Sequence, residues 1–171
     1  MDQEPGERQE HEVDLKDYLA RLPEADHKNL RSLTESISNV LRERNRRGSI
    51  KAVGGTIDKP LPRKDLDITF RLEEEEGDAK LDEHPNYLEY SKVRFQILRE
   101  IVEEAAKRNQ NLSIEEITEP IIDEEHQSLS ILKNDGSIKI KPKEGMIIEI
   151  IRKPEIASPV EKGPYVVLKA A

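Results

Sequence analysis

Two long stretches of the chain place hydrophobic residues at the spacing of an amphipathic helix. In the first, hydrophobic side chains recur every three or four residues while charged side chains fill the opposite face. Its hydrophobic positions are Leu30, Leu33, Ile37, Val40 and Leu41, and the basic segment Asn45 to Gly48 predicts its end, with the glycine as the stop. The second helix, Asn86 to Asn109, has a stripe of Leu88, Phe95, Leu98, Val102 and Ala105, widened by Ile97 and Ile101. A shorter helix is predicted within Val13 to Leu22, ending near Pro23.

Other segments follow the period of two that is typical of strands. Asp65 to Leu72 alternates polar with apolar residues, which predicts a strand with one buried face. Ser49 to Val53 also predicts a strand, and it runs directly into Gly54-Gly55. Later in the chain, Lys143-Glu144-Gly145 predicts a turn that leads into the apolar run Met146 to Ile151.

The last third of the chain is predicted to be rich in strands. Gln127 to Lys133 and Ser137 to Lys141 flank Asn134-Asp135-Gly136, whose composition indicates a hairpin turn. Ile114 to Ile122 is ambiguous, and the apolar end Tyr165 to Leu168 fits either an added strand or an interface. The fold class expected from these elements is α/β (α+β), with a mixed sheet of about four to six strands backed by two long helices.

The domain organisation follows from where hydrophobic residues are scarce. Residues 1–12 contain one apolar side chain, Met1, and we interpret them as a mobile acidic tail. Residues 13–171 are expected to form a single domain. Glu73 to Pro85 is strongly acidic and is expected to be a solvated loop rather than a metal site.

Composition and charge exclude several classes of protein. The chain has 37% charged and 35% hydrophobic residues and no Cys, which rules out disulfides and thiolate metal sites. No apolar stretch reaches the roughly 20 residues of a membrane span, and the N-terminus lacks a signal-peptide pattern, so a cytoplasmic protein is expected. The net charge of −8 and the few aromatic residues argue against bulk binding of nucleic acid and against an aromatic stacking platform. The four His residues lack the spacing of a zinc site.

The most informative chemistry lies between Val53 and Ile68. Because residues i and i+2 of a strand point to one face, Asp65 and Asp67 should lie side by side, where a divalent cation such as Mg²⁺ or Mn²⁺ would relieve their repulsion. The strand that ends in Gly54-Gly55-Thr56 allows close approach of a ligand, and its N–H groups and the Thr hydroxyl could hold phosphate oxygens. A metal bound to nucleotide phosphates would join the two elements.

This pattern resembles the signature of the DNA polymerase beta-like nucleotidyltransferase superfamily. Val53-Gly54-Gly55, nine intervening residues and Asp65-Leu66-Asp67-Ile68 match it, and the order of helices and strands agrees. The resemblance covers roughly residues 30 to 152. The segment from Glu125-His126 to Glu149-Ile150-Ile151 is also similar to a strand pair of archaeal CCA-adding enzymes. Gly55 stands where Ser is commoner.

The resemblance implies an activity and a set of roles. It implies transfer of a nucleoside monophosphate from an NTP such as ATP to a hydroxyl, with Asp65 and Asp67 binding metal and Glu149 as the third acid, where the family commonly has Asp. Gly54, Gly55 and Thr56 would position phosphates, and one of Lys59, Arg63 and Lys64 in the intervening loop could neutralise their charge. The acceptor is open between an RNA end, a protein side chain and a small molecule. Most active members also carry a helical partner domain, and none is recognised after Glu149. This is compatible with a minimal enzyme, with a subunit that needs a helical partner protein, or with an inactive descendant.

Other interpretations compete with this one. Asp65 and Asp67 are also compatible with a solvent-facing pair, Gly54-Gly55 with a plain tight turn, and Glu149 with an outward-facing residue of an edge strand. The alternative function is a catalytically inactive domain of the same fold that acts as a regulatory or antitoxin-like partner subunit. A third is a sensor that binds a nucleotide without turnover.

Overall fold

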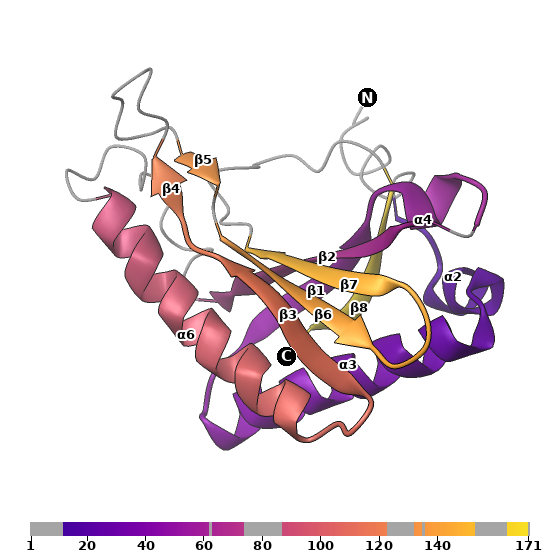
Figure 1. Cartoon of the computed structure of the whole chain (residues 1–171), viewed down its shortest axis with the longest axis horizontal. Coiled ribbons are helices and arrows are strands. Elements are labelled where there is room, and N and C mark those ends of the chain that lie inside the picture. Colours follow the sequence, from indigo (N-terminus) through magenta and orange to yellow (C-terminus); the bar gives the residue numbers. More distant parts are fainter. Residues whose placement is uncertain are drawn as a thin grey trace, which may run out of the picture.

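Six strands form one mixed sheet in the order β3-β6-β7-β2-β1-β8 (Figure 1). The computed structural model describes residues 12–61, 63–73, 87–122, 132–134, 136–152 and 164–170. The sheet strands are β1 (Gly48–Val53), β2 (Asp65–Leu72), β3 (Leu112–Thr118), β6 (Ser137–Pro142), β7 (Ile147–Arg152) and β8 (Tyr165–Ala170). All neighbours are antiparallel except β2 and β7, which are parallel. This arrangement confirms the predicted mixed sheet.

Two long helices, α3 (Glu24–Glu43) and α6 (Tyr87–Lys107), pack together and cover one face of the sheet (Figure 1). Their buried stripes contact alternate residues of the central strands, so the hydrophobic core lies between this helical layer and that face. The Arg108 guanidinium joins their C-terminal regions by donating to both carboxylate oxygens of Glu43, at 2.7 and 2.8 Å. The two predicted helices are therefore confirmed as the backing layer.

Helix α3 does not stop at Gly48 as predicted. Asn45 takes the left-handed conformation, with φ of 53°, and the N–H groups of Asn45 and Arg46 donate to the carbonyls of Arg42 and Leu41. This is a Schellman motif, in which Asn replaces the more common Gly. Gly48 instead begins β1, where its Cα faces the Arg71 carbonyl of β2 too closely for a side chain.

The predicted short helix is α2 (Leu15–Arg21), capped by the Asp14 side chain, which accepts from the N–H of Asp17. A further single turn, α4 (Gly55–Asp58), follows β1 directly and was not predicted. The apolar end of the chain is an added strand, because β8 pairs with β1 at the edge of the sheet. Before α2, the N–H of Val13 donates to the carbonyl of Tyr165.

The hairpin predicted at Asn134-Asp135-Gly136 is wrong. β5 (Leu132–Asn134) pairs with β4 (Ile121–Ile122), whereas β6 pairs with β3. Ile121 opposite Asn134 continues the register of Thr118 opposite Ser137, so the strands form one long antiparallel ribbon interrupted in the middle. Pro120 has no N–H to donate at the interruption, and Gly136 takes φ of 103°. The turn-forming composition of this segment therefore coincides with an interruption of strand pairing and not with a hairpin.

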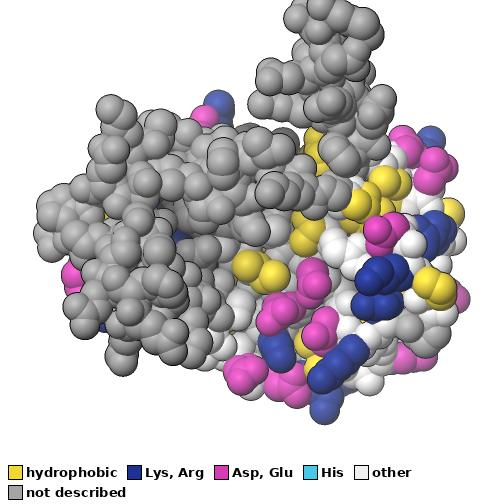
Figure 2. Space-filling model, turned by 90° about the horizontal axis from the view of Figure 1, so that it is seen from above, with side chains coloured by type: hydrophobic (Ala, Val, Ile, Leu, Met, Phe, Trp, Pro, Cys, Tyr) yellow, Lys and Arg dark blue, Asp and Glu magenta, His cyan; other side chains and the backbone are white. Residues whose placement is uncertain are grey.

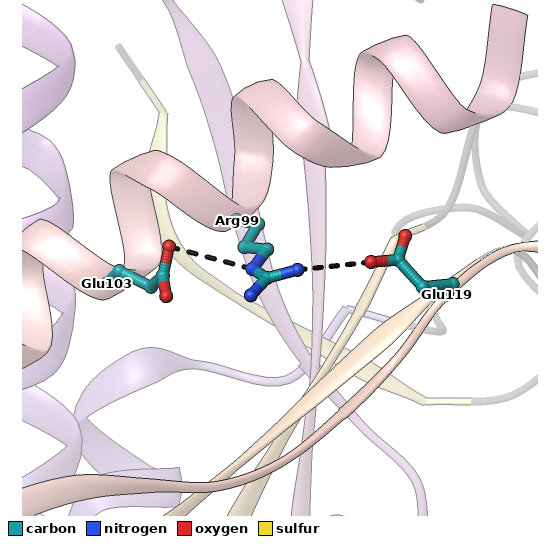
Figure 3. Close-up of polar contacts among 3 residues, drawn as sticks. All are labelled: Arg99, Glu103 and Glu119. Atoms are coloured by element: carbon teal, nitrogen blue, oxygen red, sulfur yellow. Dashed lines mark hydrogen bonds and ion pairs between the residues drawn. The ribbon is translucent and has the colours of Figure 1, made fainter.

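An ion-pair network holds this interruption against the helical layer (Figure 3). Arg99 of α6 lies between Glu103 of its own helix and Glu119, the residue after β3, with N–O distances of 3.6 and 3.1 Å. The ion pair between Arg99 and Glu119 joins α6 to the end of β3, next to the interruption of the ribbon. Glu73 aside, the predicted acidic loop lies outside the described residues, as does the predicted tail except for Glu12. No helix in the described ranges is long and apolar enough to cross a membrane.

Candidate functional site

The sheet register brings the three predicted acids together. Asp67 of β2 lies directly between Val53 of β1 and Glu149 of β7. Neighbouring strands are about 4.8 Å apart and paired residues share a face, so the carboxylates of Asp67 and Glu149 are side by side. Asp65, two residues earlier on β2, points to the same face. β7 is an inner strand, so the interpretation of Glu149 as an edge residue is wrong.

The two faces of these strands explain why the acids can sit there. On β2 and β7, the alternating residues Leu66, Ile68, Ile148 and Ile150 are at most 1% exposed and face the core. Asp65, Asp67 and Glu149 occupy the positions between them and are half-buried on the opposite face. In Figure 2, acidic and basic side chains lie close together among hydrophobic ones on the side seen from above.

A lysine that the sequence analysis missed completes the row of charges. Lys139 of β6 is the register partner of Glu149, and Glu116 of β3 is in turn the partner of Lys139. The Lys139 ammonium lies 3.7 Å from a carboxylate oxygen of Glu116. Its position depends on the pairing of β6 with β7. The wrong hairpin prediction left no basis for placing it beside the acids.

Burial and repulsion by neighbouring carboxylates disfavour the charged forms of Asp67 and Glu149. Burial raises the pKa of Asp67, and the neighbouring Asp65 carboxylate raises it further, while Arg63 and Lys139 oppose the shift. Burial likewise raises the pKa of Glu149, with Asp67 as the next cause and Lys139 in opposition. The three carboxylates thus repel one another, and the two nearby basic side chains compensate only in part.

Asp65 carries an unsatisfied oxygen. Its Oδ1 atom is buried and has no hydrogen-bond partner. An orphaned carboxylate oxygen in a buried position is costly, and a bound cation would compensate it. This atom is the structural feature that most directly fits a divalent metal.

The two glycines lie against the acids and Arg63. Gly54 has φ of 83°, and a Cβ atom on it would lie 3.1 Å from Oδ2 of Asp67. A Cβ atom on Gly55 would lie 2.7 Å from Nε of Arg63. The backbone turn therefore approaches both a site carboxylate and a guanidinium that a side chain would displace. Arg63, predicted to neutralise phosphate charge, is brought to the site.

Two of the predicted phosphate residues are placed differently. Thr56 is 1% exposed, and its hydroxyl is 2.9 Å from the Tyr18 hydroxyl, so its side chain packs in the interior rather than facing a ligand. Phosphate contacts in this turn would come from backbone N–H groups. Lys59 is exposed, and the contacts found for it are made by its backbone. The structure does not bring its side chain to the acids.

Helix α2 fixes the position of this turn (Figure 1). Tyr18 is fully buried and pairs with Thr56, and the Arg21 guanidinium donates to the carbonyls of Ile57 and Lys59. Burial raises the pKa of Tyr18, so this hydroxyl is neutral at physiological pH. The contacts of Tyr18 and Arg21 with this turn could not be predicted from the sequence pattern, because each joins residues of two different elements.

The donor set fits a hard divalent cation, since it consists of carboxylate oxygens. Within the ranges that the structure describes, however, no three His, Cys, Asp or Glu side chains form a group that could hold a metal as they stand. Binding by all three acids therefore requires their side chains to turn toward a common point.

Comparison of the chain with protein-family models, with curated proteins and with solved structures found no match. The class that the fold defines is an α/β domain with a six-stranded mixed sheet.

Proposed function

We propose that this protein is a metal-dependent nucleotidyltransferase, which moves a nucleoside monophosphate from an NTP to a hydroxyl. The observation that carries the proposal is the register pairing of Asp67 with Glu149. It gathers acids that are far apart in sequence onto one face, beside a turn without side chains at Gly54 and Gly55. Acidic residues that only face solvent require neither a shared face on neighbouring strands nor an adjacent glycine turn.

Each residue has a separate task in the proposed site. Asp65 and Asp67 hold the divalent cations, Mg²⁺ or Mn²⁺, and Glu149 turns toward them from the neighbouring strand. Gly54 and Gly55 let the triphosphate approach the backbone. Arg63, whose charge opposes the rise in the pKa of Asp67, neutralises phosphate oxygens. When bound, the cations would screen the triphosphate and lower the pKa of the attacking hydroxyl.

The transfer itself is an in-line displacement. The hydroxyl oxygen of the acceptor forms a bond to the α-phosphorus, and the bond from that phosphorus to the bridging oxygen breaks. Pyrophosphate leaves with the electron pair. Glu149, which lies beside Asp67 on the neighbouring strand, is placed to receive the hydroxyl proton.

Calorimetric titration with ATP, GTP, CTP and UTP, with and without Mg²⁺, tests the proposal without knowledge of the acceptor. The wild type is compared with Asp65→Ala/Asp67→Ala. The matched control is Glu100→Ala/Glu144→Ala, which removes the same charge from two exposed positions. We expect Mg²⁺-dependent binding that only the first double variant loses. Equal binding by both double variants would contradict the proposal.

The same titration separates the two alternatives. Metal-dependent binding without transfer to RNA ends, protein hydroxyls or small molecules would favour a nucleotide sensor. Failure of the wild type to bind any NTP would favour the inactive domain that serves as a regulatory partner, and copurification would then be the next measurement. A helical partner protein would be sought in either case, as a source of contacts to the base and the acceptor.

A further inference from the structure

We infer that Lys139 is a triphosphate-binding residue of the site, which exchanges its ion pair with Glu116 for the phosphates of the nucleotide. The inference deepens the proposed function and rests on it. It assigns a ligand contact to a side chain on β6, two strands away from the acids of β2.

The position of Lys139 supports this role. It is directly opposite Glu149 in the β6–β7 pairing and shares the face on which the acids lie. Its side chain is about one-third exposed, so the ammonium can reach a ligand placed on this face. A long flexible stem allows that group to move by several ångströms without a backbone shift.

The present partner of Lys139 leaves it available. Its ammonium is 3.7 Å from Glu116, a partly exposed carboxylate, at a distance beyond a good hydrogen bond. Such pairs contribute little to stability, so exchanging it for a triphosphate costs little. Lys139 also acts electrostatically on both Asp67 and Glu149. It is therefore close enough to the acids to meet phosphates that are held there.

A second basic residue lies on the opposite side of the acids from Lys139. Arg63 lies over Gly55 at the β1 side of the acids, and Lys139 lies at the β6 side. A triphosphate held at Asp65 and Asp67 would have a cation on each side. The predicted consequence is that the two residues act on the same anion from different strands.

The test uses the full-length protein with Mn²⁺ and inorganic triphosphate as probes, because neither depends on the unknown base. Lys139→Gln is compared with Lys107→Gln, which removes the same charge from an exposed position in the last turn of α6, in the helical layer on the other face of the sheet. Calorimetry measures Mn²⁺ alone and then triphosphate in the presence of Mn²⁺. Circular dichroism confirms that each variant is folded.

We expect opposite changes in the two affinities. Lys139→Gln should weaken triphosphate binding at least tenfold, the effect of one charge-assisted hydrogen bond. It should also tighten Mn²⁺ alone a few-fold, since a repelling charge is removed. Lys139→Arg should restore most of the triphosphate affinity, and Glu116→Gln should increase it by releasing Lys139. Lys107→Gln should change both affinities by less than about twofold.

Other outcomes overturn the inference in distinguishable ways. If Lys139→Gln tightens Mn²⁺ but leaves triphosphate affinity equal to that of Lys107→Gln, Lys139 is only a counter-ion of the acids. In that case binding that is lost in Asp65→Ala/Asp67→Ala leaves the proposed function standing. If the wild type does not bind triphosphate with Mn²⁺, both the inference and the proposed function are overturned.

Discussion

At one end of the sheet, two aspartates each lie against a glycine of positive φ, in very different surroundings. Asp26 of α3 faces Gly145, and its Oδ1 accepts the N–H of Met146 at 2.6 Å while the residue is 4% exposed. Asp67 faces Gly54, where the structure gives its carboxylate no hydrogen-bond donor among the described residues. The first acid closes the turn between β6 and β7. The second is held beside two further carboxylates.

The difference shows how a structural acid can be separated from a functional one. A buried carboxylate is tolerated when the protein satisfies it, as the Met146 N–H does for Asp26. Asp67 is instead left with a raised pKa and repelling neighbours. Such an arrangement lowers stability unless something outside the chain compensates it. Substitutions at the two positions test whether the two aspartates differ in this way.

The largest expected effect is on ligand binding by Asp67→Ala. Metal-dependent NTP binding should fall by more than about 100-fold, because a metal ligand is lost, while the fold is kept. Titration calorimetry and circular dichroism measure the two properties. Asp26→Ala is the contrasting variant, and it should bind NTP as the wild type does. Unchanged binding in Asp67→Ala would remove the distinction between the two acids.

Asp26→Ala should have the larger effect on stability. The change leaves the buried N–H of Met146 without an acceptor, which costs about 1–3 kcal/mol. Urea unfolding of the metal-free protein measures the loss. Asp26→Asn keeps an acceptor oxygen and should recover much of it. A loss below about 0.5 kcal/mol in the Ala variant would show that Asp26 does not close the turn.

The glycines give a matched pair of smaller effects. Gly54→Ala and Gly145→Ala each place a side chain at positive φ and should destabilise the protein by about 1 kcal/mol or more. Only Gly54→Ala crowds Asp67, so only this variant should also weaken NTP binding. If the two variants lose similar stability, a difference in NTP affinity between them reports the effect on the site alone. Equal NTP affinities would indicate that the Gly54 turn is not part of the site.

The smallest expected effect is a gain of stability from Asp67→Asn. Because the pKa of Asp67 is raised in the folded state above its ordinary 3.8, the folded protein binds this proton more tightly than the unfolded chain. The free energy of unfolding therefore falls as pH rises through that interval, and the cost is complete above the raised pKa. Asp67→Asn should remove it and gain about 0.5–1 kcal/mol at pH 7.

Urea unfolding in chelator at neutral pH and near pH 4 measures this dependence. The gain should shrink at the lower pH, where the wild-type carboxyl is increasingly protonated. Glu149→Gln should behave in the same way, since its pKa is also raised. A gain that is independent of pH would point to packing rather than charge.

Local patterns predicted much of this fold. The alternation of Asp65 to Leu72 gave β2 with the bounds found, and the helical stripes gave α3 and α6 to within a few residues. Both signals are periodicities set by one buried face, which a short window of sequence contains. The positions of Asp65 and Asp67 on one face follow from the same alternation.

Features that depend on pairing were harder to predict. Asn134-Asp135-Gly136 has turn chemistry, yet the register continues past it and Pro120 interrupts the ribbon instead. Only the pairing of β6 with β7 places Lys139 in the site, and the Thr56 hydroxyl contacts Tyr18 in the interior instead of facing the site. In each case the partner is distant in sequence, so no local propensity identifies it.

The parallel pairing of β2 with β7 also has a consequence for folding kinetics. The proposed site exists only once strands about eighty residues apart in sequence have met, and such long-range contacts form slowly. A ligand that needs both strands cannot bind the unfolded chain. If the contacts also form after the rate-limiting barrier, Mn²⁺ with triphosphate should slow unfolding and leave the refolding rate nearly unchanged. The ligand would then stabilise the native state only after the folding barrier has been crossed, in a chain that folds without it.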